Sequence, residues 1–392
     1  MSRARVVTCA GGAAWEAPLV RELQRPGLAV DVLRRCVDHG ELLAFAAREH
    51  PCAALVAAEV PWLDRDFVGA LHDAGVAVIA VEAQPNGRPL DRIGIAHRIA
   101  APPEVDEVAG ILHGLEPGGD PAVPVVASPA SRQDGDGRLI TVWGGPGSPG
   151  RTSVAVHLAA ELALIEAPAL LVDGDSWAPS IAQVLGLEPE PALTNAANNA
   201  ANGWAVPLAS SLQNGPSGVR VLAGLSRADL WPEVREQSWR AVLDAARAEA
   251  SIVVVDVAAP VEEDEELSFD RVPFRRNLMT RVALEEADQV LMVVRADPVG
   301  LRHGIFAHRA LRDALPRAAD RTAVVLNHTP AAARRTQECS RAIEEWTGSA
   351  PVALLPREEA FARAAWEGQL LAQVAPRSRW LRELRTMNGI RR

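Results

Sequence analysis

Residues Leu139–Ser153 read LITVWGGPGSPGRTS, and this stretch decides the fold of the C-terminal part of the chain. It predicts a buried strand, a glycine-rich turn and the start of an alanine-rich helix. Gly145 and Gly150 bracket four residues, and Arg151 and Thr152 follow them. This is the spacing of a phosphate-binding loop (P-loop), with arginine where lysine is usual. A glycine turn that arose by chance is the alternative.

The predicted loop supplies the groups that hold a nucleotide. In such loops backbone N–H groups wrap the β-phosphate, and the helix N-terminus adds the positive end of its dipole. The Thr152 hydroxyl is placed to bind Mg²⁺. Arg151 can pair with a phosphate, although its planar fork is bulkier than an ammonium group. We therefore expect the nucleotide to be bound by Gly145, Gly147, Ser148, Gly150, Arg151, Thr152 and Ser153.

Three aspartates follow strand-like runs, at the edge where ligands bind in this architecture. Asp173 and Asp175 end the run LLVDGD, and Asp256 ends SIVVVD, which is the pattern of a Walker B strand. We expect Asp173 and Asp256 to hold the metal together with Thr152. Asp175 is expected to orient an attacking water, with Arg151 as the other catalytic residue. Ordinary capping or turn aspartates are the alternative.

Asn327 ends another apolar run, AVVLN. In related nucleotide folds an asparagine at this place reads the adenine edge with its amide, and we expect the same here. A turn-forming asparagine is an equal alternative. His303 and His308 have no partner at metal or catalytic spacing, so we interpret them as core or surface histidines.

Composition excludes several classes of protein. The chain has 392 residues and a net charge of −10, which argues against nonspecific DNA binding by the whole surface. No apolar run is long enough to span a bilayer and no signal peptide is expected, so we expect a cytoplasmic protein. Four scattered cysteines fit a reducing compartment. Lysine is absent, so the 40 residues counted as Lys or Arg are all arginine.

The pattern of apolar residues predicts two α/β domains. In residues 1–115 the predicted strands and helices alternate as in a small doubly wound domain of the flavodoxin-like or receiver-like kind. Residues 116–137 are rich in Pro, Gly, Ser and Asp and predict a flexible linker. Residues 138–392 predict a larger, doubly wound P-loop domain, with parallel strands that are covered on both faces.

The pattern of apolar residues predicts strands in both domains, and those of the second domain are continuously apolar. In the first domain they are Arg5–Cys9, Ala29–Leu33, Ala53–Ala58, Val76–Val81 and His97–Ala100. In the second they are Leu139–Trp143, Ala169–Asp173, Val219–Leu222, Ile252–Asp256, Gln289–Val294, Thr322–Asn327 and Val352–Leu355.

These motifs, in this order, resemble the MinD/ParA group of P-loop ATPases with a deviant Walker A loop. Within that group they are most similar to CpaE/TadZ-like proteins, often called septum-site-determining proteins. The likeness is carried by GGPGSPGRTSVAVHLAAELA, LLVDGDSWAPSIAQVLGL, VVVDVAAP and LLPREEAFARAAWEGQLLAQVAPRSRW. The resemblance implies ATP and Mg²⁺ as cofactors and a nucleotide-dependent homodimer. It further implies a role in positioning Flp/Tad pilus assembly or septum components.

The chain departs from this family at the loop. The family loop reads K-G-G-x-G-K-[ST]; aligned on Thr152, Pro146 replaces the first lysine, which reaches across the dimer. Arg151 replaces the second lysine, and Ser148 replaces a glycine. Proline carries no charge that could stabilise a transition state in the partner's site, so we expect weak or absent hydrolysis. An active ATPase of the ParA/MinD kind, cycling on DNA or membrane, is the alternative.

The N-terminal domain lacks the residues of a phosphorylatable receiver. Its strand ends read CAGGAAWE, AAEVP and IAAPPE, with only Glu59 near the acceptor position and no lysine. We therefore expect a pseudo-receiver that docks to a pilus-assembly or cell-division protein. Nucleic acid is not expected as a partner.

The C-terminal tail predicts an amphipathic helix. Trp380, Leu381, Leu384 and Met387 form one stripe among arginines. MinD-type proteins bind anionic membranes with such a tail, which would give a polar or membrane-associated location. Because the stripe is short, we favour a helix packed on its own sheet, with Trp380 as a core anchor.

Overall fold

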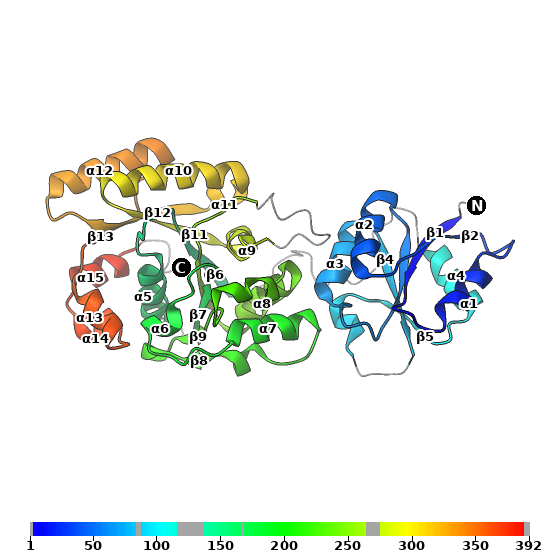
Figure 1. The fold of residues 1–392 in the computed structure, drawn as a ribbon. Coiled ribbons are helices and arrows are strands. Elements are labelled where there is room, and N and C mark those ends of the chain that lie inside the picture. The colour runs from blue at the N-terminus through cyan, green and yellow to red at the C-terminus, as the bar shows by residue number, and fades with distance from the viewer. Residues whose placement is uncertain (1–2, 84–87, 116–136, 166–167, 264–274, 388–392) are drawn as a thin grey trace. The chain divides into compact units, whose positions relative to one another are not determined.

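The computed structural model describes residues 3–83, 88–115, 137–165, 168–263 and 275–387. These residues form two compact units (Figure 1). The first unit comprises the described residues up to 115, and residues 198–206 group with it. The second comprises most of the chain from residue 137 onward. The predicted linker lies outside the described residues, apart from Gly137.

The first unit contains a parallel sheet flanked by helices on both faces. Its strands are β1 (Ala4–Cys9), β2 (Val30–Arg35), β3 (Ala53–Ala57), β4 (Ala77–Glu82) and β5 (His97–Ala100). Its helices are α1 (Glu16–Leu23), α2 (His39–Glu49), α3 (Arg65–Asp73) and α4 (Val105–Gly114), with a 3-10 turn η1 (Leu90–Ile93). The strand order is β2-β1-β3-β4-β5, which is the flavodoxin-like order. Each of the five predicted strands overlaps an observed one.

The second unit contains an eight-stranded sheet. Its strands are β6 (Arg138–Trp143), β7 (Ala169–Gly174), β8 (Gln213–Asn214), β9 (Arg220–Leu222), β10 (Ile252–Val257), β11 (Gln289–Arg295), β12 (Thr322–Thr329) and β13 (Ala353–Pro356). Their order is β13-β12-β11-β6-β10-β7-β9-β8, and all neighbours run parallel except β8 and β9. The seven predicted strands are all present. The two-residue β8 was not predicted, because so short a pairing leaves no periodic pattern.

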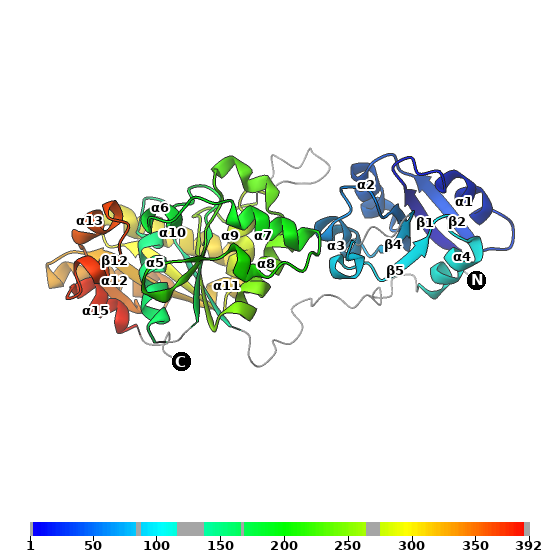
Figure 2. The same cartoon turned by 90° about the horizontal axis from the view of Figure 1, so that it is seen from below.

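Helices cover both faces of this sheet, which makes it the predicted doubly wound arrangement (Figures 1 and 2). On one face lie α5 (Arg151–Ala163), α6 (Ile181–Val184), α13 (Ala360–Trp366), α14 (Leu371–Val374) and α15 (Arg379–Arg385). On the other lie α8 (Glu236–Glu249), α9 (Leu278–Glu286), α10 (Pro298–Ala314), α11 (Pro316–Ala319) and α12 (Ala333–Thr347). The remaining elements are α7 (Ala192–Ala201) and the 3-10 turns η2 (Leu208–Ser211), η3 (Pro216–Gly218) and η4 (Ala228–Glu233). Among the described residues, no helix combines the length and hydropathy that crossing a membrane requires.

The C-terminal stripe packs against the sheet, as favoured from the sequence. Trp380, Leu381, Leu384 and Met387 are all at most 3 % exposed and belong to the core under α5. Arg385 fixes α15 to α5 through two bonds to Glu161, of 2.6 and 2.8 Å. The apolar face that a membrane would need is therefore buried within the protein.

His157 joins the P-loop helix to the C-terminal helices. Its Nδ1 lies 2.8 Å from the Ser153 carbonyl oxygen, and the Leu371 backbone N–H donates to its Nε2 at 2.9 Å. Nδ1 therefore carries the proton, because an accepting Nε2 cannot. The ring makes edge contacts with Phe361 and Trp380, at 5.0 and 5.6 Å between ring centroids. Burial lowers the pKa of His157 to about 4.

We predict that His157 makes the protein less stable in acid. At pH values above about 6.5 the imidazole is neutral in the folded and the unfolded state. As pH falls from there towards 4, only the unfolded state takes up the proton, so the free energy of unfolding drops by roughly 1.4 kcal/mol per pH unit. Urea unfolding of the wild type and His157→Gln between pH 7.5 and 4.5 measures this. The stability advantage of the wild type should shrink as pH falls, and a constant difference would contradict the assignment.

Candidate nucleotide-binding site

The P-loop joins β6 to α5, and its shape depends on glycine. Gly147 and Gly150 have φ values of +98° and +95°, in the left-handed region, and Ser148 shares that region at +52°. A Cβ atom on Gly150 would lie 2.3 Å from the Asn327 side-chain nitrogen, and one on Gly144 would lie 2.3 Å from the Val293 carbonyl oxygen. The loop is thus pressed against the ends of β11 and β12, where no side chain fits.

Helix α10 supports the other side of the loop. A Cβ atom on Gly145 would lie 3.0 Å from the carbonyl oxygen of His303 and 3.1 Å from Ala307 Cβ. The His303 Nδ1 is 3.1 Å from the Pro146 carbonyl oxygen. This role of His303 was not predicted from the sequence. The contact joins residues 157 positions apart, and nothing in the local sequence signals it.

The Arg151 guanidinium lies along the loop from which it projects. Its Nη1 donates to the Gly144 and Gly145 carbonyl oxygens, at 2.9 and 3.3 Å. Its Nη2 is 3.7 Å from Asp175 Oδ2. The side chain is only 19 % exposed, so this cation sits within the predicted phosphate site and is paired with the predicted catalytic carboxylate.

The Thr152 hydroxyl and Asp256 form the centre expected for a metal. Thr152 Oγ1 donates to Asp256 Oδ2 at 2.6 Å. Asp256 is 1 % exposed, and its Oδ1 is buried without a hydrogen-bond partner among the described residues. Burial, and then the neighbouring Asp173, raise the pKa of Asp256 to about 8. Magnesium binds through one or two protein oxygens plus phosphate and water oxygens, so this donor set fits Mg²⁺.

Asp173 and Asp175 are both tied to backbone N–H groups. Asp173 lies beside Asp256 in the register of β7 and β10. Its Oδ1 accepts from the Asp175 N–H at 3.2 Å, and its Oδ2 accepts from Ser180 and Ile181, both at 2.9 Å. Burial raises the pKa of Asp173 to about 6. Asp173 therefore organises the turn after β7, and its contact with a metal remains a prediction.

Asp175 starts a turn that holds an exposed tryptophan. Its Oδ1 accepts from the Trp177 and Ala178 N–H groups, both at 2.8 Å. Trp177 is 43 % exposed and stacks under the Arg276 guanidinium, at 3.6 Å from the ring centroid. Its indole N–H donates to Asn277 Oδ1 at 3.1 Å. These contacts link the loops that follow β7 and β10, and they were not predicted from the sequence.

The remaining predicted residues lie at the loop, in the first turn of α5 or at the end of β12. Ser153 belongs to the first turn of α5, where its carbonyl oxygen receives the His157 bond. Asn327 is 2 % exposed and donates to the Pro149 carbonyl oxygen at 2.9 Å. The structure therefore brings the predicted site residues together at the carboxyl ends of β6, β7, β10 and β12. Direct contact of Asn327 with a base remains a prediction.

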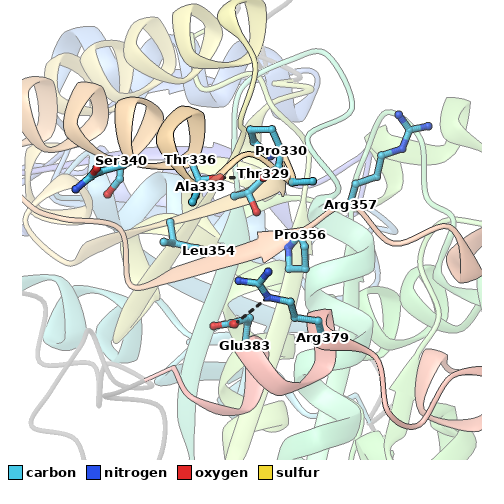
Figure 3. Close-up of a pocket in the computed structure, with 12 residues that line it drawn as sticks. Thr329, Pro330, Ala333, Thr336, Ser340, Leu354, Pro356, Arg357, Arg379 and Glu383 are labelled. Atoms are coloured by element: carbon cyan, nitrogen blue, oxygen red, sulfur yellow. Dashed lines mark hydrogen bonds and ion pairs between the residues drawn. The ribbon is translucent and has the colours of Figure 1, made fainter.

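A pocket of about 510 Å³ opens beside this end of β12. Figure 3 shows Thr329 and Pro330 on one side and the ion pair of Arg379 and Glu383, at 3.5 Å, on the other. Leu354 and Pro356 of β13 line the wall between them. Thr329 lies two residues beyond Asn327, so the pocket adjoins the strand end that holds the P-loop. Its volume is in the range of small-molecule sites.

We predict that binding of Mg²⁺ and ATP at pH 7.5 releases about three-quarters of a proton, the fraction that a group with a pKa of about 8 holds at that pH. The metal needs an ionised carboxylate, and Asp256 is largely protonated below pH 8 when no metal is bound. Its affinity for the metal should therefore rise with pH up to about 8. Calorimetric titration in two buffers of different ionisation enthalpy measures the proton count. Asp256→Asn should lose the release and Asp229→Asn, a surface change, should keep it; equal heats in both buffers would contradict the linkage.

No protein-family model and no curated protein matches the chain. Solved structures of known proteins, however, share the fold of the P-loop unit. Two solved structures are similar at a TM-score of 0.50. One is the cell division ATPase MinD of Pyrococcus furiosus, 18% identical over 65% of this chain and 98% of its own. The other is MinD of Pyrococcus horikoshii in complex with Mg-ADP, 15% identical over 64% of this chain and 93% of its own. A ParA family ATPase of Chlorobium tepidum has a TM-score of 0.51, with 18% identity over 63% of this chain and 96% of its own. The P-loop unit therefore has the fold of the MinD and ParA ATPases.

Proposed function

We propose that this protein is an ATP-binding spatial regulator of the CpaE/TadZ kind. It binds Mg-ATP at the P-loop, closes into a homodimer and positions pilus-assembly or septum components in the cytoplasm. In this proposal ATP acts as a stoichiometric ligand that is hydrolysed slowly or not at all. The N-terminal unit provides the docking surface for the partner.

The observation that carries the proposal is the pairing of Thr152 with Asp256 behind a glycine-rich loop. The Thr152 hydroxyl is a hard oxygen donor at the place where a P-loop presents Mg²⁺, and so is the Asp256 carboxylate oxygen that has no hydrogen-bond partner among the described residues. When bound, Mg²⁺ would neutralise charge between the β- and γ-phosphates. MinD of Pyrococcus horikoshii, which shares this fold, was solved with Mg-ADP. Arg151 would turn from the loop carbonyls and Asp175 to the phosphates.

Two features support slow turnover. Pro146 stands where the family has its first lysine, so the loop lacks the cation that would reach into the partner's site. Asp175 already accepts two backbone N–H bonds at one oxygen and faces Arg151 with the other. A general base must be free to take a proton from water, and these bonds hold Asp175 in a structural role.

The pocket beside β12 is the proposed place of the base and ribose. It adjoins the strand end that holds the P-loop, and Thr329 and Arg357 offer polar groups on its lining (Figure 3). Pro330 and Pro356 offer flat apolar surface against which a base can lie. A nucleotide whose phosphates lie in the loop would thus place its base over the ends of β12 and β13.

The N-terminal unit is proposed to bind a protein partner and not to accept a phosphoryl group. It contains no lysine. Glu59 stands near the acceptor position, and it accepts the backbone N–H of Ala83 at 2.6 Å. The carboxylate therefore holds two strand ends together.

The test of this function is tight ATP binding with little turnover. At 100 times its dissociation constant, Mg-ATP should stabilise the wild type by about 2.7 kcal/mol in thermal unfolding. Arg151→Ala should lose most of this gain, while Arg227→Ala, which removes a surface guanidinium, should keep it. Phosphate release should stay well below about 1 s⁻¹, the low end of typical enzyme turnover. Rapid release that Asp175→Ala abolishes would instead establish a working ATPase.

Dimerisation gives a second, independent prediction. Sedimentation velocity should detect a shift from monomer towards dimer when Mg-ATP is added, because the triphosphates lie at the interface in the proposed state. ADP should leave the distribution closer to that of the nucleotide-free protein. A protein that stays monomeric at saturating Mg-ATP would refute the dimer, whatever its affinity for the nucleotide.

A further inference from the structure

We infer that Asn327 positions the P-loop and does not read the base, and that Trp380 of the C-terminal helix fixes it in that role. The inference deepens the proposed function, because it rests on nucleotide binding at the loop. It differs from the adenine contact expected from the sequence. Nucleotide affinity would then depend on a residue far along the chain that touches no phosphate.

The Asn327 amide is engaged on both sides. Its Nδ2 donates to the Pro149 carbonyl oxygen at 2.9 Å, and its Oδ1 accepts from the Trp380 indole N–H at 3.1 Å. The residue is 2 % exposed. Its Nδ2 also occupies the space beside Gly150 that a side chain there would need. An amide that is buried and held in this way is not presented to an adenine.

The indole determines which way the amide points. Trp380 Nε1 can only donate a hydrogen bond, so it must face the amide oxygen. The amide nitrogen is then directed at Pro149, which lacks an N–H and has only its carbonyl to offer. Without the indole the two ends of the amide could exchange, and the Pro149 carbonyl would lose its donor. Trp380 therefore sets the polarity of the contact with the loop.

Trp380 is itself held rigidly. It is fully buried, and it makes edge contacts with Phe361 at 4.9 Å and with His157 at 5.6 Å between ring centroids. His157 is fixed at both ring nitrogens, by Ser153 and by Leu371. The C-terminal helices thus contact Pro149 through Asn327, and they contact the first turn of α5 through His157.

This arrangement orders the loop before any ligand arrives. Phosphate binding needs the backbone N–H groups to point inwards, and a loop that is ordered in advance loses less entropy on binding. The effect acts on the phosphates, so it should be the same for any ligand that carries a triphosphate. Reading of the base by Asn327 would act on adenine nucleotides alone.

The experiment compares Mg-ATP with Mg-tripolyphosphate, which has no base, as ligands for the full chain. Trp380→Phe keeps an aromatic ring and removes the N–H donor. Trp239→Phe is the matched control, because Trp239 is equally buried and donates its indole N–H to the Met279 carbonyl oxygen at 3.1 Å, away from the loop. Asn327→Ala removes the amide itself. Amide hydrogen exchange in the nucleotide-free proteins reports loop order directly, at the residues of 145–150 that carry a backbone N–H: Gly145, Gly147, Ser148 and Gly150.

We expect Trp380→Phe and Asn327→Ala to weaken both ligands by the same factor, about three- to tenfold, as for the loss of one hydrogen bond. Exchange at residues 145–150 should be faster in both variants, and Trp239→Phe should change neither measurement. Weakening of Mg-ATP alone in Asn327→Ala would overturn the inference, because it would make Asn327 a base reader. Equal effects of the two tryptophan variants would overturn it as well.

The exchange measurement separates this inference from the proposed function. If the wild type binds neither ligand, the proposed nucleotide function fails. The positioning role then stands if exchange at residues 145–150 rises in Trp380→Phe and not in Trp239→Phe, and falls if it does not.

Discussion

The loop from Gly144 to Gly150 can approach β11 and β12 so closely only because no side chain stands in the way. At Gly144 a Cβ atom would lie 2.3 Å from the Val293 backbone carbonyl oxygen, and at Gly150 it would lie 2.3 Å from the Asn327 side-chain nitrogen. Gly150 also has a φ of +95°, which favours glycine. The start of α5 follows from this placement. It brings Thr152 onto Asp256 and lays Arg151 between the loop carbonyls and Asp175. The pairing of Thr152 with Asp256, the position of the Arg151 cation and the turn after β7 are therefore all consequences of one tight backbone path.

Two sets of contacts connect the loop to the rest of the P-loop unit. One runs through Asp175 and Trp177 to the loop after β10, where Arg276 and Asn277 meet the indole. The other runs through Asn327 and Trp380 to the C-terminal helices. The second explains why the apolar stripe of α15 is buried although its sequence resembles a membrane-binding tail. Trp380 lies inside the protein, where its indole N–H donates to the buried Asn327 amide.

The strands and the P-loop could be predicted from the sequence because each depends on residues that are close together in the chain. The run at β6, the glycine spacing and the aspartates at strand ends are local patterns, and the parallel sheet then brings them to one edge. The contacts of His303, Trp177 and Trp380 could not be predicted, since they join residues between 53 and 157 positions apart. The hydrogen bonds from backbone N–H groups to the Asp173 carboxylate could not be predicted, for a related reason. They depend on how the chain turns after β7, which apolar periodicity does not encode.

The absence of lysine bears on how the phosphate site can be regulated. Acylation by activated acetyl or succinyl donors neutralises an ε-amino group, and it would silence a P-loop that relies on lysine. A guanidinium is inert to those donors and keeps its charge when it is methylated. Acyl donors in the cell therefore cannot neutralise the Arg151 cation at the loop. If the loop binds nucleotide as proposed, its occupancy would depend on the concentrations of nucleotide, magnesium and protons.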